Sequence, residues 1–232
     1  MELLFSDIRA ALGEVGASLV GGHSEVTSAV TRPVVVGQML GFSEGGRVLS
    51  TAGTRPGDVV LQVGPVPVEG AAVLATEAEN LLAGVDPAVI GAAKAATEHP
   101  GISIVDAALS AAALGARALH DPTEGGLAAA LHEMAAAAGV RLRVDRTQVL
   151  WFDPGVALCQ ALGADPWATL ASGALLAAFD PAAARAAAEA LHAQGWMVAT
   201  VAEAEPGSGV VDIDERPIPW PKRDEVSRIF ER

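Results

Sequence analysis

The chain has 232 residues, of which 51% are apolar, so it is long enough and apolar enough to bury a core. Asp and Glu number 28 against 15 Lys and Arg, which gives a formal net charge of −13. This balance argues against a nucleic-acid or anionic-membrane surface, because such surfaces need a basic face. A polyanionic ligand would have to be held locally, by metal ions, backbone amides or helix N-termini.

The sequence offers neither a disulfide framework nor a membrane span. Cys159 is the single cysteine, which excludes an intrachain disulfide and a cysteine zinc cluster. The most apolar stretch, 102–119, is interrupted by Asp106 and Arg117 and lacks the run of about 20 apolar residues that a span requires. The N-terminus shows no basic segment followed by a cleavage site. We therefore expect a soluble, cytoplasmic protein.

The first fifty residues predict one helix followed by strands. Apolar residues at helical spacing predict a helix over 3–17, and a short strand over 18–20 leads into a glycine turn. The β-branched run within 32–42 predicts a strand, with which 48–50 can pair after a turn. The boundary between two domains is expected near 52–57.

From residue 59 onward, the pattern alternates between strands and helices. Strands are predicted over 59–63, 140–145, 173–179, 197–202 and 210–213. Helices are predicted over 70–83, 87–97, 104–116, 125–138, 154–162, 182–194 and 223–230. The fold class is therefore mixed α/β, with residues 1–53 and 54–232 as its two domains.

Two glycine-containing segments are candidates for ligand binding. Gly21 and Gly22 let the backbone approach a ligand, and His23 and Ser24 add a base and a hydroxyl. The alternative is a tight turn with solvated polar side chains. Residues 171–176 form a small-residue turn before a buried strand, which indicates close packing. Cys159 lies among apolar residues of a predicted helix and is interpreted as a core residue.

The segment 120–127, HDPTEGGL, is the stronger candidate because it runs into a predicted helix. Thr123 is placed to cap that helix, whose free N–H groups would face a ligand. Asp121 beside it is a natural magnesium ligand, since Mg²⁺ takes one or two carboxylates and leaves its other positions to phosphate and water. The alternative is a capping turn in which Asp121 and Thr123 only satisfy backbone donors.

Four segments in this order resemble the AIR synthase-related superfamily, which includes HypE-like maturation proteins, selenophosphate synthetase and thiamine-monophosphate kinase. They read GGHSEVT at 21–27, RPGDVVLQVGP at 55–65, LHDPTEGGLAAALHEMA at 119–135 and ASGALLAAF at 171–179. The HDPTEGG form is most similar to the HypE-like branch. The resemblance implies a C-terminal domain of that superfamily, preceded by the last helix and strands of its N-terminal domain.

The same resemblance implies ATP-dependent phosphorylation of an amide or carbonyl oxygen, with Mg-ATP as cofactor. Carried over by position, Asp121 would hold the magnesium ion or the phosphates. The nucleotide contacts implied by the resemblance are Gly21, Gly22, His23, Ser24, Thr123, Gly125 and Gly126. The native substrate stays open.

Two departures from the family pattern shape the expectations. The acid-rich strands of the family's first domain are absent, so the ATP site is expected to be incomplete in this chain. The chain also ends in Phe230, Glu231 and Arg232 rather than in the cysteine that HypE proteins modify, so that chemistry on its own tail is not expected. The incomplete first domain leaves strand edges unpaired, which predicts a homodimer or a partner chain that supplies the missing strands.

Three functions therefore remain open. The first is an ATP-dependent enzyme whose site is completed by a partner or by missing residues. The second is a non-catalytic binding or assembly module that keeps the C-terminal domain fold. The third is an aminoimidazole ribonucleotide cyclo-ligase, to which the HDPTEGG segment is less similar.

Overall fold

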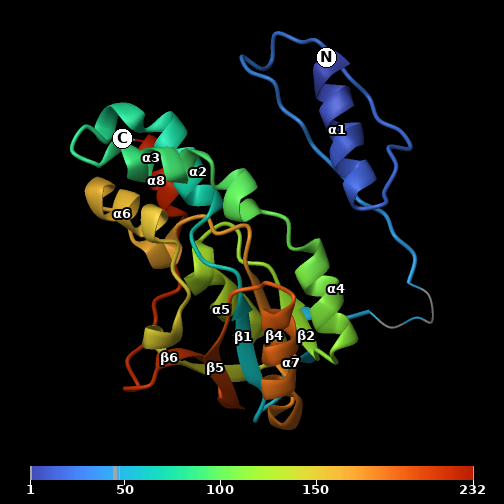
Figure 1. Ribbon diagram of the computed structural model, residues 1–232, viewed down its shortest axis with the longest axis vertical. Helices are drawn as coiled ribbons and strands as arrows, with labels where there is room; N and C mark the ends of the chain where they lie inside the picture. Colours follow the sequence, from blue (N-terminus) through green and yellow to red (C-terminus); the bar gives the residue numbers. More distant parts are fainter. Residues whose placement is uncertain (1, 44–45, 47, 232) are drawn as a thin grey trace. The chain divides into compact units, whose positions relative to one another are not determined.

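The chain folds into two compact units, which the computed structural model describes over residues 2–43, 46 and 48–231. The first unit comprises residues 1–48 and the second comprises residues 49–232. Figure 1 shows the chain coloured along its sequence.

The first unit contains the helix α1 (Glu2–Glu14), none of whose residues is buried. The predicted helix is confirmed, although it ends at Glu14 rather than at residue 17. The strand predicted over 32–42 is wrong, and the described residues of 18–20 and 48–50 are not in strands either. A strand needs a neighbouring backbone to bond its N–H and C=O groups, and the described residues of this unit supply none to the β-branched run.

A six-stranded sheet forms the centre of the second unit. Its strands are β1 (Val59–Val63), β2 (Ala118–His120), β3 (Val140–Val144), β4 (Leu175–Phe179), β5 (Val198–Pro206) and β6 (Gly209–Asp212). Their order is β2-β4-β1-β5-β3-β6, and all neighbours are antiparallel except β3 and β6. The five strands predicted after residue 59 are confirmed. Strand β2 was not predicted, because three residues are too few to show an alternating pattern.

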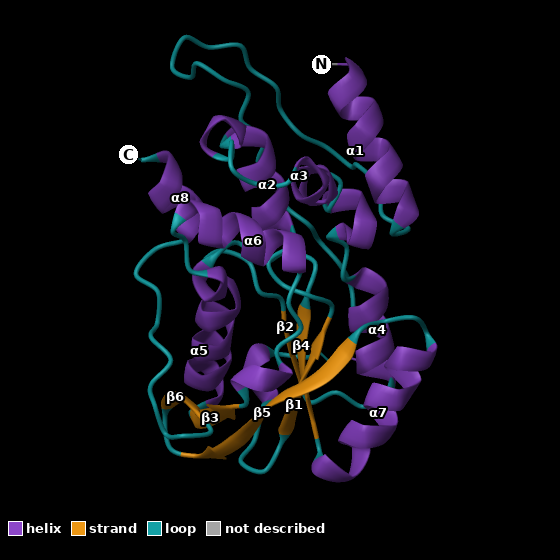
Figure 2. Cartoon of the chain, turned by 60° about the vertical axis from the view of Figure 1, so that its left-hand side comes forward, coloured by secondary structure: helices purple, strands orange, loops and turns teal. Residues whose placement is uncertain are grey.

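Helices cover both faces of this sheet and gather at one end of it (Figure 2). They are α2 (Glu69–Glu77), α3 (Pro87–Lys94), α4 (Val105–Ala113), α5 (Gly126–Ala138), α6 (Asp153–Leu162), α7 (Pro181–Ala193) and α8 (Glu225–Phe230). All helices predicted after residue 59 are confirmed, with ends shifted by a few residues. None of the described helices is long and apolar enough to cross a membrane.

The period of two along β1 explains how one sheet holds two cores. Leu61 and Val63 point into a cluster with α4 and α7, while Val60 points into a cluster with α5. A third cluster joins α2, α3, α6 and α8 at the end of the sheet. Alanines dominate the buried faces of α4 and α5, so these helices lie close against the strands.

Arg117 joins three elements of the sheet domain through two carboxylates. Its guanidinium pairs with Asp58, whose side chain is fully buried before β1, and with Asp180 at 2.6 Å. Asp58 also accepts a hydrogen bond from the backbone N–H of Arg55 at 2.8 Å, and Asp180 caps α7 through the N–H of Ala182. The starts of β1, β2 and α7 are therefore tied together by one side chain.

Replacing Arg117 with Met should destabilise the protein by about 3 kcal/mol, because Asp58 would keep a buried charge without its partner. Urea unfolding of the variant measures this loss. Arg185→Met is the control, since that side chain is 91% exposed on α7 and its loss should change stability by less than about 0.5 kcal/mol. Equal stability of Arg117→Met and the wild type would contradict the role given to this ion pair.

Candidate functional site

The connection from β2 to α5 places one carboxylate in solvent. Pro122 is buried, whereas Asp121 beside it is exposed and makes no hydrogen bond or ion pair with another described residue. The loop is therefore anchored by its proline while the carboxylate of Asp121 is left accessible.

His120 anchors the other end of this loop to two separate elements. Its Nε2 lies 2.8 Å from a carboxylate oxygen of Glu133 on α5, and its Nδ1 lies 3.3 Å from the hydroxyl of Thr51. The Thr51 hydroxyl also donates to the backbone carbonyl of Leu119 at 3.2 Å. These contacts fix the strand end immediately before Asp121. Sequence spacing could not reveal them, because Thr51 lies 69 residues away from His120.

The predicted cap of α5 by Thr123 is wrong. The N-cap residue of α5 is Gly125, whose backbone is left-handed with φ of 76°. Glycine has no side chain, so the N-cap residue itself cannot bond the free N–H groups of the helix. The carbonyl of Thr123 instead accepts the N–H groups of Gly126 at 3.0 Å and Ala171 at 3.2 Å. Two successive glycines with positive φ turn the chain, so the Thr123 hydroxyl lies too early to serve as the cap.

Asp224 bonds the helix start in place of Thr123. One of its carboxylate oxygens accepts the N–H of Gly125 at 2.7 Å, and the other accepts the N–H of Val226 at 2.8 Å. It therefore caps α8 and α5 together. Burial raises the pKa of the Asp224 carboxyl, while the two backbone N–H groups act in the opposite direction.

The two glycines at the start of α5 serve close packing. Both are buried. A Cβ on Gly126 would lie 2.6 Å from the carbonyl oxygen of Thr169 and 2.7 Å from that of Trp167. A side chain at this position would therefore push α5 away from the turn at 167–169. A direct contact of Gly125 or Gly126 with a nucleotide stays a prediction.

The remaining predicted nucleotide contacts lie in the first unit. Gly21, Gly22, His23 and Ser24 are all exposed in an irregular segment that follows α1. Ser24 lines a shallow cavity of about 470 Å³ together with Glu2, Phe5 and Arg9. The structure describes these residues within their own unit, and their role in nucleotide binding stays a prediction.

Asp121 has the chemistry of a partial metal ligand. Among the described residues, no group of three or more His, Cys, Asp and Glu side chains is placed to hold a metal ion. A protein cage for a resident ion is therefore not present in that part of the chain. One exposed carboxylate does fit a magnesium ion that keeps phosphate and water as its other ligands.

Other reactive side chains have structural roles. Cys159 is buried, and burial raises the pKa of its thiol to about 11, so it stays a protonated core residue beside Thr169. His132 lies 2.7 Å from the carbonyl of Ile218 through Nε2 and stacks on Trp220 with ring centroids 5.0 Å apart. It thereby holds the C-terminal segment against α5.

The six-stranded sheet with helices on both faces defines the second unit as a mixed α/β domain. The family model described as AIR synthase related protein, C-terminal domain, matches residues 55–214. Since this match covers more than half of the chain, the chain belongs to the AIR synthase-related family.

Individual relatives are carbamoyl dehydratases named HypE. The protein of Rhodobacter capsulatus is 33% identical over 181 residues, which covers 77% of this chain and 51% of the relative. That of Rhizobium leguminosarum bv. viciae is 30% identical over 198 residues, covering 83% of this chain and 53% of the relative. The chain thus spans about half the length of the curated relatives it matches.

Solved structures share the fold at lower identity. HypE of E. coli superposes with a TM-score of 0.61 at 23% identity, covering 78% of this chain and 55% of that one. A thiamine-monophosphate kinase from Stenotrophomonas maltophilia reaches 0.57 at 17% identity, covering 75% and 55%. A HypE in complex with ATP reaches 0.55 at 22% identity, covering 78% and 55%. The fold class expected from the sequence is confirmed.

Removing the shared cap should weaken two helices at once. Asp224→Ala deletes the acceptors of Gly125 and Val226 and is expected to cost about 2 kcal/mol, because each cap contributes about 1 kcal/mol. Asp86→Ala is the matched control, since Asp86 caps α3 alone through the N–H of Ala88. Denaturant unfolding should show about twice the loss for Asp224→Ala, and equal losses would contradict a cap shared by two helices.

The contribution of Asp224 should also depend on pH. Because its pKa is raised in the folded protein, the folded state binds more protons than the unfolded state between the ordinary and the raised value. The unfolding free energy that Asp224 contributes therefore falls as pH rises through this window. Unfolding at about pH 4 and about pH 7 should show a smaller cost of Asp224→Ala at the higher pH. A cost that grows with pH would mean that burial does not dominate the pKa.

Proposed function

We propose that the chain contributes the C-terminal domain of an ATP-dependent enzyme that phosphorylates an amide or carbonyl oxygen. The observation that carries this proposal is the family match over 55–214, which includes the exposed Asp121 on the loop before α5. The printed names of the relatives support it, because they include carbamoyl dehydratases and a HypE in complex with ATP. The activity of a whole enzyme is part of the proposal, since the chain spans about half of those relatives.

The proposed role of Asp121 follows from charge and exposure. A chain with a net charge of −13 repels a nucleotide, so the phosphates need a magnesium ion that neutralises them. Asp121 would supply one carboxylate to that ion, and His120 would hold the loop through Thr51 and Glu133. Gly21, Gly22, His23 and Ser24 are proposed as nucleotide contacts on the sequence resemblance alone.

Binding of Mg-ATP should depend on the Asp121 carboxylate. A ligand present at about a hundred times its dissociation constant adds about 2.7 kcal/mol and raises the melting temperature by several degrees. We expect such a shift with ATP and Mg²⁺, a smaller one with ATP and EDTA, and loss of the magnesium-dependent part in Asp121→Asn. Thermal unfolding measures all three.

Asp106→Asn is the control for this experiment, because Asp106 is another exposed carboxylate without a partner among the described residues. It should keep the full shift. An unchanged shift in Asp121→Asn would remove the metal role of that residue. No shift in the wild type would favour the second function described next.

A non-catalytic assembly module is the second candidate, and the start of α5 favours it. Gly125 and Gly126 are buried, and the N–H of Gly125 is already bonded by the Asp224 carboxylate. The helix terminus that would attract a phosphate therefore holds an anionic group of the chain itself. A domain kept as a scaffold needs no open anion site at this position.

The first unit is proposed to bind a second copy of the chain. Its described residues include exposed apolar side chains, among them Val34, Val35, Val36, Leu40 and Phe42. Water contact with so much apolar surface is unfavourable, and burial against an identical segment would remove it. A relative is known in a HypE–HypF complex, so a different partner chain is the alternative occupant.

The chain should therefore sediment as a dimer at micromolar concentration. Val35→Asp places a charge in the apolar segment and should shift the population toward monomer in analytical ultracentrifugation. Val26→Asp is the control, since Val26 is 90% exposed outside that segment. A wild-type chain that sediments only as a monomer would overturn the homodimer.

A further inference from the structure

The C-terminal segment 213–231 is attached to the rest of the second unit at three buried residues. They are Ile218, Asp224 and Ile229, and no other described residue of the segment is buried. Ile229 packs into the cluster that joins α2, α3, α6 and α8, whereas Ile218 packs into the cluster that contains α5. The two apolar residues fix the ends of the segment, and Asp224 lies between them.

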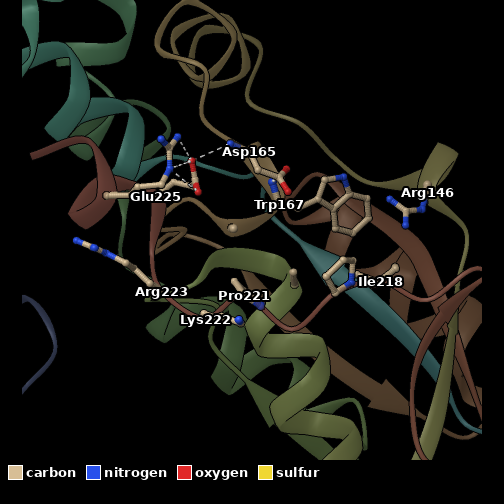
Figure 3. A pocket seen from close by; sticks show the side chains of 12 residues that line it. Arg146, Asp165, Trp167, Ile218, Pro221, Lys222, Arg223 and Glu225 are labelled. Carbon is tan, nitrogen blue, oxygen red and sulfur yellow. Dashed lines mark hydrogen bonds and ion pairs between the residues drawn. The ribbon is translucent and has the colours of Figure 1, made fainter. Parts of the chain in front are cut away.

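A cavity of about 340 Å³ lies beside the middle of this segment. It is lined by residues within 218–223 of the segment and by residues within 165–168 of the sheet domain, among others. Figure 3 shows Pro221 beside this cavity, with the Arg223 side chain pointing away from Trp167. The middle of the segment therefore borders a cavity on this side instead of a packed core.

The same stretch has few hydrogen bonds to the domain. The backbone N–H and C=O of Ile218 are both bonded, to β6 and to His132 respectively. Among the described residues, 219–223 make no hydrogen bond to the rest of the second unit, and the two prolines within that stretch have no backbone N–H. Trp220 stacks on His132, with ring centroids 5.0 Å apart. Few interactions must therefore break for 219–223 to leave the surface of the domain.

Asp224 is the polar point of attachment, and it connects the segment to the loop before α5. One of its carboxylate oxygens accepts the N–H of Gly125 at 2.7 Å, and the other accepts the N–H of Val226 at 2.8 Å. Burial raises the pKa of this carboxyl, and the charge of Glu124 acts in the same direction. An ionised Asp224 therefore gains favourable hydration when it leaves this position, which offsets part of the cost of breaking its bond to Gly125.

The loop on the other side of this bond depends on a second acceptor, the carbonyl of Thr123. It accepts the N–H groups of Gly126 at 3.0 Å and of Ala171 at 3.2 Å. Gly125 and Gly126 both have positive φ, and glycine moves between such conformations and ordinary ones without a side-chain clash. The loop can therefore rearrange at these two residues, and release of Gly125 frees one end of the loop that carries Asp121.

We propose that residues 219–224 form a latch that opens and closes while the rest of the domain stays folded. Opening carries Asp224 away from Gly125 and loosens the loop 121–125 in the same step. Local opening is favoured where few buried contacts and few hydrogen bonds hold a segment. The C-terminal segment thereby controls how firmly the exposed carboxylate of Asp121 is positioned, whatever ligand that carboxylate binds.

Native-state hydrogen exchange of the full chain, followed by NMR, tests the latch. The amides of Gly125 and Ala171 should share one local opening, with protection factors at least about a hundredfold below those of β1, which is paired on both sides by β4 and β5. Trp220→Ala removes the stack on His132 and leaves the acceptors of both amides in place. It should speed exchange at Gly125 and Ala171 by the same factor, about threefold to tenfold.

Met197→Ala is the matched control, because Met197 is 51% exposed outside the segment while Trp220 is 52% exposed. It should leave both exchange rates unchanged. The β1 amides in the same spectra report overall stability, so a general loss of stability is measured separately. Protection of Gly125 equal to that of β1 would overturn the latch. So would a Trp220→Ala variant that speeds exchange at Gly125 and leaves Ala171 unchanged, or an equal acceleration by Met197→Ala.

Discussion

A backbone contact at the first residue of α5 sets the positions of two regions of the second unit. The carbonyl oxygens of Trp167 and Thr169 lie against Gly126 at distances that no Cβ could tolerate. On one side of this contact the chain leads back to the exposed carboxylate of Asp121. On the other side the same turn carries Trp167, whose ring contacts Arg146 and Trp151. Any residue larger than glycine at position 126 would therefore displace the two regions together.

Although the net charge of the chain is −13, many of its acidic side chains are paired within the fold. Most buried or half-buried acids have a cation or a backbone N–H as partner, as with Asp58 beside Arg117 and Asp212 beside Arg146. Because these carboxylates are satisfied internally, the groups that remain available stand out. Among them is the exposed carboxylate of Asp121, which has no hydrogen-bond or ion-pair partner among the described residues.

The sequence was most informative where a structure depends on local pattern. Among the described residues after 59, helical spacing and β-branched alternation located every α-helix and all strands except the three-residue β2. The errors arose where the partner lies far along the chain. The run at 32–42 has strand propensity without a neighbour, and Thr123 is a good capping residue displaced by Asp224. Ion pairs between distant segments, such as Arg117 with Asp58 and Arg146 with Asp212, were also missed, because these partners meet only in the folded domain.

The cap that Asp224 provides affects the order in which parts of the domain can fold during synthesis. Gly125 and its acceptor are 99 residues apart, and the acceptor follows all six strands of the sheet in the chain. During translation the N–H of Gly125 therefore lacks its Asp224 acceptor while strands β3 to β6 emerge from the ribosome. The start of α5 can gain this cap only after Asp224 has been synthesised, so it reaches its final structure later than the strands of the sheet can pair.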